Sequence, residues 1–377
     1  MSRVKLGDVA REYKATVKDN SGFPIVGLEH LSPGEITLDR WDTDVETTFT
    51  KSFKKGHMLF GRRRAYLKKA AVAPFDGVCS GDIIVIEAIP EKINPDLLPF
   101  IIQNDLLFDY AVGNSSGSLS PRVKWESLKG YEFELPEISK QTELADLLEA
   151  AYSTKKAYQQ QIIASDKLVK SQFIELFGNL GSDEKGWGLT TLGECCILNP
   201  KRPKGIEDNI LVSFVPMPAV TEEGIIDCSN LKTYGEVKKG FTYFAENDVL
   251  FAKITPCMEN GKGAVAEGLS NGIGAGSTEF HVLRPIEGKS NPYWLYIITR
   301  FDSFRKAARK VMTGTGGQLR VPVSFLESHP ISLPPIELQN EFELFVRQLD
   351  KSKFELKQAI ANISELMKSL IQQDFSN

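Results

Sequence analysis

The sequence predicts an α+β fold: two mixed α/β globular domains, each followed by a long helix, with the two helices packed as an antiparallel coiled coil with pseudo-twofold symmetry. Three observations predict this fold. A segment with the pattern L-P-x-I-x-x-Q occurs twice, from Leu135 to Gln141 and from Leu333 to Gln339. A stretch with helical heptad spacing follows each copy. The copies lie 198 residues apart, counted from Leu135 to Leu333, which is the size of a domain plus one helix.

The repeat continues in register through both helical stretches. At the same offset, the segment from Leu168 to Ser171 falls on the segment from Leu366 to Ser369. In the globular parts the offset drifts: Gly56 to Phe60 resembles Asn247 to Phe251, and both segments lead into basic residues. Insertions therefore fall in the globular parts, while the helices keep their length.

Each globular half is predicted to mix α and β structure in a similar order. In the first half we expect short strands over 69–74 and 78–89, and a helix over 96–110. In the second half we expect strands over 248–254 and 279–283, and a helix over 292–311 with Asn291 as its cap.

Each long helix is predicted to cover about 39 residues, or roughly 58 Å at about 1.5 Å per residue. Helices of this length rarely stand alone, and since each one ends a half, antiparallel packing of the two is the economical arrangement. Lys155 and Lys353 share one seam position, where we expect both to extend their amines to water or to mark the register. The seam positions are Leu144, Leu148, Ala151, Lys155, Tyr158, Ile162, Ser165, Val169 and Gln172 in the first helix and Phe342, Val346, Leu349, Lys353, Leu356, Ile360, Ile363, Met367 and Leu370 in the second.

Composition favours an ordinary soluble protein, with 42% hydrophobic and 25% charged residues in a chain of 377. Because the sequence has neither an apolar run of about eighteen residues nor a basic-then-apolar leader, we expect a cytoplasmic protein without a membrane span. The five cysteines form no C-x-x-C pair and lie far from the histidines. We therefore expect small buried cysteines, with neither zinc nor a disulfide framework.

The net charge of -4 counts at first against a nucleic-acid partner, but phosphate binding needs only a local basic surface. Such a surface is available between residues 51 and 69, which include no acidic residue. A solvated basic face explains this segment equally well. Its basic residues are Lys51, Lys54, Lys55, Arg62, Arg63, Arg64, Lys68 and Lys69.

Together these features resemble the specificity subunit of type I restriction-modification enzymes, over essentially the whole chain. That family has two target-recognition domains, each followed by a long helix, with L-P-P-x-x-E-Q or a near variant at the join. Here Glu137 stands for the second proline of the first join, and Lys140 and Leu338 hold the place of the Glu before Gln. The resemblance implies target-recognition domain 1 over 1–138, a central spacer helix over 139–178, target-recognition domain 2 over 179–336 and a C-terminal spacer helix over 337–377.

Shorter motifs inside the domains add to the resemblance. The segment from Asn247 to Lys253 looks like the family's G-D-[IV]-L-x-x-[RK] motif, with Asn247 for the usual Gly, and the segment from Gly56 to Arg62 resembles it more loosely. The segment from Gly316 to Arg320 looks like the family's G-x-x-Q motif. In the first half the segment from Gly117 to Arg122 takes that place without the Gln.

The resemblance implies DNA recognition without catalysis. The family's specificity subunit reads a two-part sequence in double-stranded DNA, one part per domain, and its helices hold the two readers a fixed distance apart. It binds two modification (methyltransferase) subunits, which carry S-adenosylmethionine, and the assembly can add restriction subunits that use ATP and Mg. We expect no cofactor, no metal and no membrane contact for this chain.

The predicted DNA-binding residues are cations, hydroxyls and an amide beside predicted strands or a glycine-rich loop. Arginine is the commonest bidentate reader of guanine, and the other types contact phosphates or base edges. Any of them could instead only solvate the surface, as could the basic loop with Lys201, Arg202 and Lys204. The candidates are Arg62, Arg63, Arg64, Lys68, Ser118 and Arg122 in the first half, and Lys253, Thr255, Lys262, Gln318 and Arg320 in the second.

Catalytic motifs have no match in the sequence. The segment from Leu333 to Ile336 lacks the polar head and the aromatic residue of the [DNS]-P-P-[YFW] motif that holds a target amino group in adenine methyltransferases. Gly261-Lys262 lacks the rest of a phosphate-binding loop. Two alternatives stay open: an interaction protein whose coiled coil is an oligomerisation stalk, and a nuclease or methylase with a motif of another kind.

Overall fold

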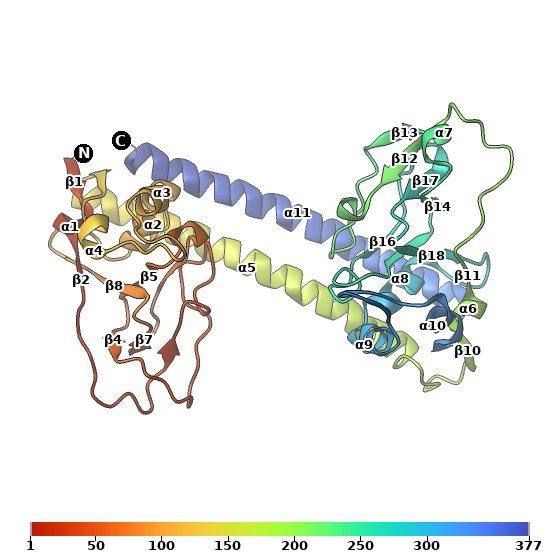
Figure 1. Cartoon of the computed structure of the whole chain (residues 1–377), viewed down its shortest axis with the longest axis horizontal. Helices are drawn as coiled ribbons and strands as arrows, with labels where there is room; N and C mark the ends of the chain where they lie inside the picture. Colours follow the sequence, from red (N-terminus) through yellow and green to blue (C-terminus); the bar gives the residue numbers. More distant parts are fainter. Residues whose placement is uncertain (1, 376–377) are drawn as a thin grey trace. The chain divides into compact units, whose positions relative to one another are not determined.

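The computed structural model describes residues 2–375, and the chain divides into two units (Figure 1). The first unit comprises Met1–Gln160 with Leu356–Asn377, and the second comprises Gln161–Glu355. Both boundaries fall inside long helices, α5 (Ile138–Phe177) and α11 (Ile336–Phe375). Each unit therefore contains a globular domain and a part of both long helices. Residues 376–377 of the predicted C-terminal helix lie outside the described residues.

The first unit contains a four-stranded sheet of order β2-β8-β5-β6, a three-stranded sheet of order β3-β7-β4 and the pair β1-β9. The predicted strands over 69–74 and 78–89 are confirmed as β6, β7 and β8. Besides the long helices, the elements are β1 (Ser2–Lys5), α1 (Leu6–Val9), β2 (Ala10–Glu12), β3 (Ile25–Val26), β4 (Lys51–Phe53), β5 (Met58–Gly61), η1 (Ala65–Leu67), β6 (Ala70–Val72), β7 (Gly77–Cys79), β8 (Ile83–Ala88), α2 (Leu98–Ile102), α3 (Asp105–Gly113), α4 (Trp125–Leu128) and β9 (Glu132–Leu135).

The second unit contains sheets of order β11-β18-β15-β16 and β13-β12-β17-β14, and the pairs β10-β21 and β19-β20. The strands predicted over 248–254 and 279–283 are confirmed as β15 and β18. The elements are β10 (Leu189–Thr191), α6 (Leu192–Cys195), β11 (Cys196–Leu198), β12 (Leu211–Val215), η2 (Met217–Ala219), β13 (Leu231–Thr233), α7 (Tyr234–Val237), β14 (Thr242–Ala245), β15 (Val249–Ala252), β16 (Gly263–Val265), η3 (Ser270–Gly272), β17 (Ile273–Gly276), β18 (Phe280–Pro285), α8 (Pro292–Arg300), α9 (Asp302–Lys310), β19 (Thr313–Thr315), β20 (Gln318–Arg320), α10 (Val323–Ser328) and β21 (Pro330–Ser332).

The two units repeat one sheet plan. In the four-stranded sheets, β5 lies antiparallel between β8 and β6, and β15 lies antiparallel between β18 and β16. In the other sheets a parallel pair, β3 with β7 or β12 with β17, is joined by an antiparallel strand, β4 or β14. All residues of β5 and β15 are buried, which explains their unbroken apolar sequences. The repeat at the joins therefore extends through the sheets.

The two central strands begin beside different pairs of polar side chains. His57, just before β5, lies 3.9 Å from Glu87 of β8. Asp248, just before β15, accepts two hydrogen bonds of 2.7 Å from Arg284 of β18. Burial lowers the pKa of His57 below its ordinary value, and the Asp248 side chain is only 1% exposed. The two sheets therefore share a strand order but not a charge arrangement.

The helix predicted over 96–110 is in fact two helices, α2 and α3. Asn104 lies between them with extended backbone, and its side chain accepts a hydrogen bond of 3.1 Å from the backbone N–H of Leu106. The physical reason for the correction is that this side chain caps α3, so a second helix starts here. Sequence periodicity alone did not reveal the cap.

The helix predicted over 292–311 is likewise broken, into α8 and α9. Phe301 separates them, with φ −70° and ψ 137°, and its ring lies 5.0 Å from the ring of Phe173 in the core. The predicted cap is confirmed: Asn291 accepts a hydrogen bond of 2.8 Å from the backbone N–H of Tyr293. The break leaves the Phe301 ring packed in the core.

Gln141 and Gln339 make the same hydrogen bonds at the start of each long helix. The side-chain oxygen of Gln141 accepts from the backbone N–H of Asn94 at 2.8 Å, and that of Gln339 accepts from the backbone N–H of Asn291 at 2.9 Å. In both cases the amide nitrogen donates at 2.8 Å to the proline carbonyl five residues earlier. Gln141 is 2% exposed and Gln339 is fully buried. The repeated segment thus ends in a buried amide that fastens the helix to the loop before α2 or α8.

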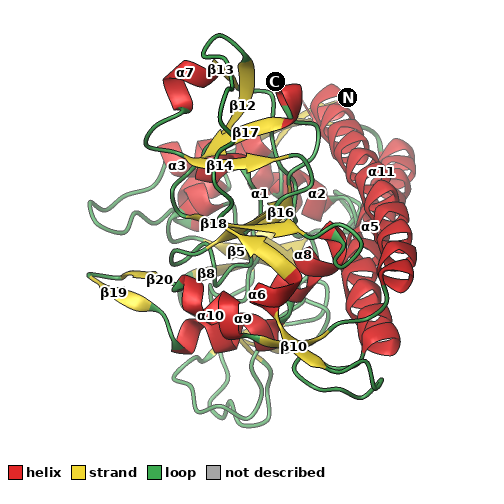
Figure 2. Ribbon diagram, turned by 90° about the vertical axis from the view of Figure 1, so that its right-hand side faces the viewer, coloured by secondary structure: helices red, strands yellow, loops and turns green. Residues whose placement is uncertain are grey.

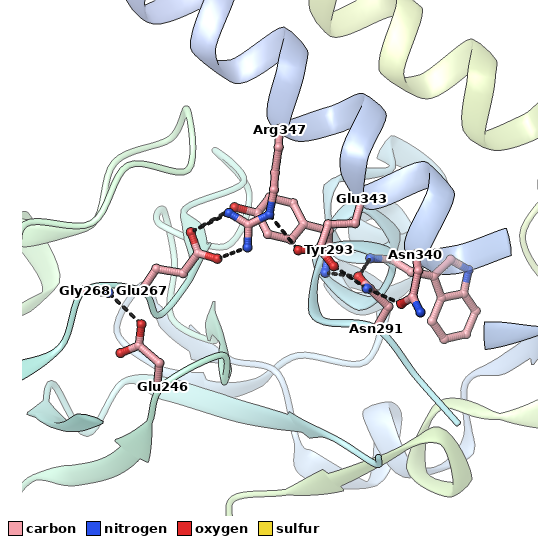
Figure 3. Close-up of polar contacts among 9 residues, drawn as sticks. Glu246, Glu267, Gly268, Asn291, Tyr293, Asn340, Glu343 and Arg347 are labelled. Carbon is pink, nitrogen blue, oxygen red and sulfur yellow. Dashed lines mark hydrogen bonds and ion pairs between the residues drawn. The ribbon is translucent and has the colours of Figure 1, made fainter. Parts of the chain in front are cut away.

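The second unit adds further polar contacts at this join (Figure 3). The side-chain amide of Asn291 donates to Glu343 of α11. Arg347, one turn further along α11, donates to Glu343 at 2.6 Å and also to Glu267. Its guanidinium lies 4.5 Å from the ring centre of Tyr293. Helix α11 is therefore fixed to its domain by charge as well as by apolar packing.

The predicted seam residues of both long helices are all buried or half-buried. In the first unit Leu144 and Leu148 share a core with Met367, so the start of α5 lies with the end of α11. In the second unit Val169 shares a core with Phe342 and therefore the end of α5 lies with the start of α11. The heptad spacing correctly identified the packed face in each unit.

One of the two expectations for Lys353 was that its amine extends into water, and this expectation is wrong. Its Nζ lies 3.0 Å from Asp166 of α5 and 2.6 Å from Asp350, and its side chain is 16% exposed. Burial lowers the pKa of Lys353, but the hydrogen bonds and charges of Asp350 and Asp166 outweigh burial and leave the pKa raised. Lys155 is half-buried. The lysine of the second unit is thus paired within the seam.

The cysteines are all free, and Cys79, Cys195 and Cys196 are buried as predicted. Cys228 and Cys257 are only half-buried, against the prediction, because they lie at the edge of a core cluster rather than inside it. Burial raises the pKa of the Cys79 thiol to about 12. The Cys79 thiol is therefore a protonated packing group at neutral pH.

Replacing Gln339 by Ala should destabilise the protein, because the buried N–H of Asn291 would lose its acceptor. The expected loss is about 1–3 kcal/mol of unfolding free energy. Urea denaturation measures it, with Gln348→Ala as the control, since Gln348 is an exposed glutamine of the same helix. Equal stability of the two variants would show that the buried amide does not hold the join.

Candidate nucleic-acid interface

In the first unit, two predicted segments that lie far apart in sequence come together beside β5. The backbone N–H of Arg64 donates to the carbonyl of Pro121 at 2.8 Å, and the N–H of Val123 donates to the carbonyl of Arg62 at 3.0 Å. Arg63 and Arg122 are also bridge partners. The segment 62–64 is therefore hydrogen-bonded to the loop 116–122 through the backbone, and both contain predicted DNA-binding residues.

A carboxylate lies at the centre of this arrangement. Asp82, directly before β8, accepts hydrogen bonds of 2.7 Å and 3.2 Å from the guanidinium of Arg122. Arg63 lies 3.6 Å from the same carboxylate and donates to the Ser120 hydroxyl at 3.1 Å. The hydrogen bond from Arg122 lowers the pKa of Asp82 below its usual value, so the carboxylate is ionised at neutral pH. This ion pair holds the loop in place.

The second unit repeats the arrangement with other side chains. The backbone N–H of Val321 donates to the carbonyl of Lys253 at 2.9 Å, and the N–H of Thr255 donates to that of Leu319 at 3.0 Å. The guanidinium of Arg320 donates to Glu279 at distances between 2.7 and 3.1 Å. The hydrogen bond from Arg320 lowers the pKa of Glu279. Glu279 directly precedes β18, as Asp82 precedes β8.

The loop held by this second clamp is the hairpin β19–β20. Gly316 and Gly317 form its two-residue turn with φ of 65° and 79°, a conformation that favours glycine at both positions. The hydroxyl of Thr255 donates to the carbonyl of Gly317 at 2.7 Å, and Gln318 is exposed. Figure 2 shows the hairpin on the side of the domain away from α11. The side-chain amide of Gln318 is thus exposed on a hairpin that hydrogen bonds hold in place.

The candidate lysines make hydrogen bonds within the protein that the sequence did not indicate. Lys262 donates to the carbonyl of Met217 at 3.2 Å. Lys69 holds the equivalent place before β6 in the first unit and donates to the carbonyl of Leu28 at 2.7 Å. A hydrogen bond from Lys68 to Asp105, 2.6 Å long, raises the pKa of this lysine. Lys68 therefore lies apart from the clamp.

A groove of the second unit adds the basic loop to this surface. Lys201, Arg202 and Lys253 line it together, with Tyr243 and His281. Arg202 also donates to the carbonyl of Phe241, which ties the loop to the domain. The loop that the sequence left ambiguous therefore lies along the same groove as Lys253.

The structure thus brings most of the predicted DNA-binding residues together. Some of them hold loops in place, and others are exposed. Arg122 and Arg320 are occupied by carboxylates and so position the loops. Arg64, Ser118 and Gln318 are exposed. Sequence reasoning missed Asp82 and Glu279, although one signal was present: in both halves an acidic residue directly precedes a buried strand. Whether each candidate contacts DNA stays a prediction.

Among the described residues, no helix is both long enough and apolar enough to cross a membrane. In the same part of the chain, no group of three or more His, Cys, Asp or Glu side chains is placed to hold a metal ion.

Comparison with known families matches most of the chain. The family model described as the type I restriction modification DNA specificity domain covers residues 2–165 and 184–365. The chain therefore belongs to this family, with one matched region in each half.

Within the family, the chain resembles two specificity subunits from Escherichia coli. It is 42% identical over 164 residues to the type I restriction enzyme EcoEI specificity subunit and 41% identical over 167 residues to that of EcoAI. These matches cover 41% and 44% of this chain, but 27% and 28% of the relatives. The match thus spans little more than a quarter of the length of these relatives.

Two solved structures share the fold over nearly the whole chain. One, from a study of complex assembly and conformational transition of the type I R-M system, has a TM-score of 0.56 at 18% identity and covers 99% of this chain and 97% of that one. The type I restriction-modification S subunit from M. genitalium has a TM-score of 0.56 at 11% identity, covering 100% and 96%. At these identities the similarity concerns the fold.

Removing either carboxylate should loosen only its own loop. Asp82→Ala is expected to increase amide hydrogen exchange over 116–122 and to leave 313–320 unchanged, because its ion pair with Arg122 is lost. Glu279→Ala should do the reverse. Hydrogen–deuterium exchange with mass spectrometry measures both loops in each variant, so each variant is the other's control. Unchanged exchange in both loops would contradict the positioning role.

Proposed function

We propose that this chain is the non-catalytic DNA sequence-recognition subunit of a type I restriction-modification complex. It reads a bipartite target in double-stranded DNA, one half-site per domain. The observation that carries the proposal is the repeated clamp: in each unit an arginine–carboxylate pair braces a loop beside the end of β5 or β15. Side chains suited to phosphates and base edges lie on both sides of each clamp.

The two long helices act as the spacer, packed as an antiparallel coiled coil that relates the halves by a pseudo-twofold axis. Their bounds support this proposal, because α5 and α11 begin and end at positions 198 residues apart, from Ile138 to Ile336 and from Phe177 to Phe375. The shared cores within each unit agree with it. Helix length then sets the number of unspecified base pairs between half-sites, at about 3.4 Å per base pair.

The helices also recruit the partner subunits: two modification subunits with S-adenosylmethionine, and restriction subunits that use ATP and Mg. Exposed apolar side chains on the helices support this role. Leu168 is 47% exposed and its counterpart Leu366 is 51% exposed. Equivalent apolar positions on both helices suit two copies of one partner. Such a complex works in the cytoplasm, where the chromosome is.

Methyl transfer belongs to the modification subunit in this proposal. The purified chain, incubated with S-adenosylmethionine and DNA, should therefore transfer no methyl group until the modification subunit is added. Methylation by the chain alone would favour the alternative in which it is an enzyme.

Sequencing of methylated bases in a host with and without this chain tests the function directly. A methylated motif of two parts should disappear when the chain is absent, and its sequence would identify the target. An unchanged methylation pattern would overturn the proposal.

The acidic overall charge favours one other function, an interaction protein in which the long helices are a stalk. A gel-mobility assay at 50 and 200 mM salt separates the two functions. A protein that neutralises DNA phosphates releases counterions, so its affinity should fall steeply with salt, by about a thousandfold for six contacts. Affinity that ignores salt would favour the stalk.

Substitutions in the two interfaces should affect different half-sites. Arg64→Ala is expected to weaken binding at the first half-site by about 1–3 kcal/mol if its guanidinium reads a base, and Gln318→Ala should do so at the second. Binding to duplexes with each half-site scrambled in turn measures both effects. Equal loss of preference at both half-sites from either variant would contradict two independent readers.

A further inference from the structure

Leu119 is an apolar side chain exposed where the first interface would meet DNA. It is 91% exposed, far more than the other large apolar side chains of the described residues. A single exposed leucine is ordinary on a protein surface. Its position is what matters here, because Leu119 lies in the loop 116–122 that the Asp82 clamp holds.

The base of this loop is braced on several sides. Ser116 and Arg122 exchange two backbone hydrogen bonds of 3.0 Å each. The hydroxyl of Ser120, next to Leu119, accepts from Arg63 at 3.1 Å. On the other side of the leucine, Gly117 has a φ of 115°, which favours glycine. The loop is thus fixed at its base while Leu119 is left outside every core cluster.

The second unit has a different chemistry at the equivalent place. Counted back from the paired arginines Arg122 and Arg320, Leu119 corresponds to Gly317 in the turn of β19–β20. Gln318 follows that glycine and is exposed. A two-stranded ribbon of this kind fits the major groove of DNA, which is about 12 Å wide. The hairpin of the second unit therefore suits readout in the major groove, and the loop 116–122, which an equivalent arginine–carboxylate pair holds, is assigned to the same groove.

The major-groove edges of the four bases present hydrogen-bonding groups and one apolar group, the C5 methyl of thymine. A glutamine amide pairs with an adenine edge. A leucine has no hydrogen-bonding group, so the thymine methyl is the base feature that it recognises.

We propose that Leu119 is a specificity-determining residue that contacts the C5 methyl of a thymine in the first half-site. The inference rests on the proposed function, since it requires that the first unit reads DNA. Arg64 lies on the segment laced to this loop and is exposed, which suits a phosphate or base contact beside the leucine. The segment 62–64 and the loop 116–122 thus together offer a cation for binding and an apolar side chain for base selection.

The test removes the methyl group and the leucine separately. The complete restriction-modification complex, with wild-type chain or Leu119→Ala, is titrated with duplexes in which each thymine of the target is replaced in turn by deoxyuridine. Fluorescence anisotropy gives the dissociation constants. Leu106→Ala is the control variant, because Leu106 is an exposed leucine on α3 of the same unit.

The wild-type and Leu106→Ala complexes should bind about fourfold more weakly when one thymine of the first half-site loses its methyl group, the effect of about one buried methyl. The Leu119→Ala complex should bind the unmodified target more weakly and show no further loss at that thymine. Its response to substitutions in the other half-site should be unchanged.

Full discrimination by Leu119→Ala at every thymine would overturn the inference, as would a wild-type complex indifferent to deoxyuridine throughout the first half-site. In both cases the complex still binds its target, so the proposed function stands. A complex that fails to bind any specific duplex would instead contradict the proposed function itself.

Discussion

The side-chain amide of one buried glutamine anchors each long helix to its domain. Asn291 caps α8 and Asn94 lies in the loop before α2, and the backbone N–H of each needs a partner outside a helix. Gln141 and Gln339 satisfy these N–H groups from the first turn of the long helices. A helix that slid or rotated on its domain would break these hydrogen bonds, so they help to set which residues of each helix face the domain.

Much of the fold could be predicted from the sequence because its signals are local and occur twice. The spacing from Gln141 to Gln339 and the heptads predicted the two long helices, and the buried strand β15 was visible as an apolar run. The breaks at Asn104 and Phe301, which divide two predicted helices, could not be predicted. A helix-capping amide and a core phenylalanine are both compatible with a helical pattern, and only tertiary packing decides between them.

The interfaces were predictable by residue type but not by role. Arg122 and Arg320 have the chemistry of base readers, yet each is paired with a carboxylate about forty positions away in sequence, brought near only by the sheet. Arg64 and Gln318 remain exposed. Because an ion pair and a base contact use the same guanidinium, the sequence alone could not separate a residue that positions a loop from one that contacts a ligand.

The different polar pairs beside β5 and β15 bear on how such a chain folds. Two sheets with one strand order in the same polypeptide invite pairing of a strand with the wrong sheet during folding. If β15 entered the first sheet, Asp248 would face the carboxylate of Glu87, and if β5 entered the second, Arg284 would face His57 and lose its counter-charge. Either exchange would leave a charged side chain of the sheet without its partner, which disfavours the wrong strand pairing.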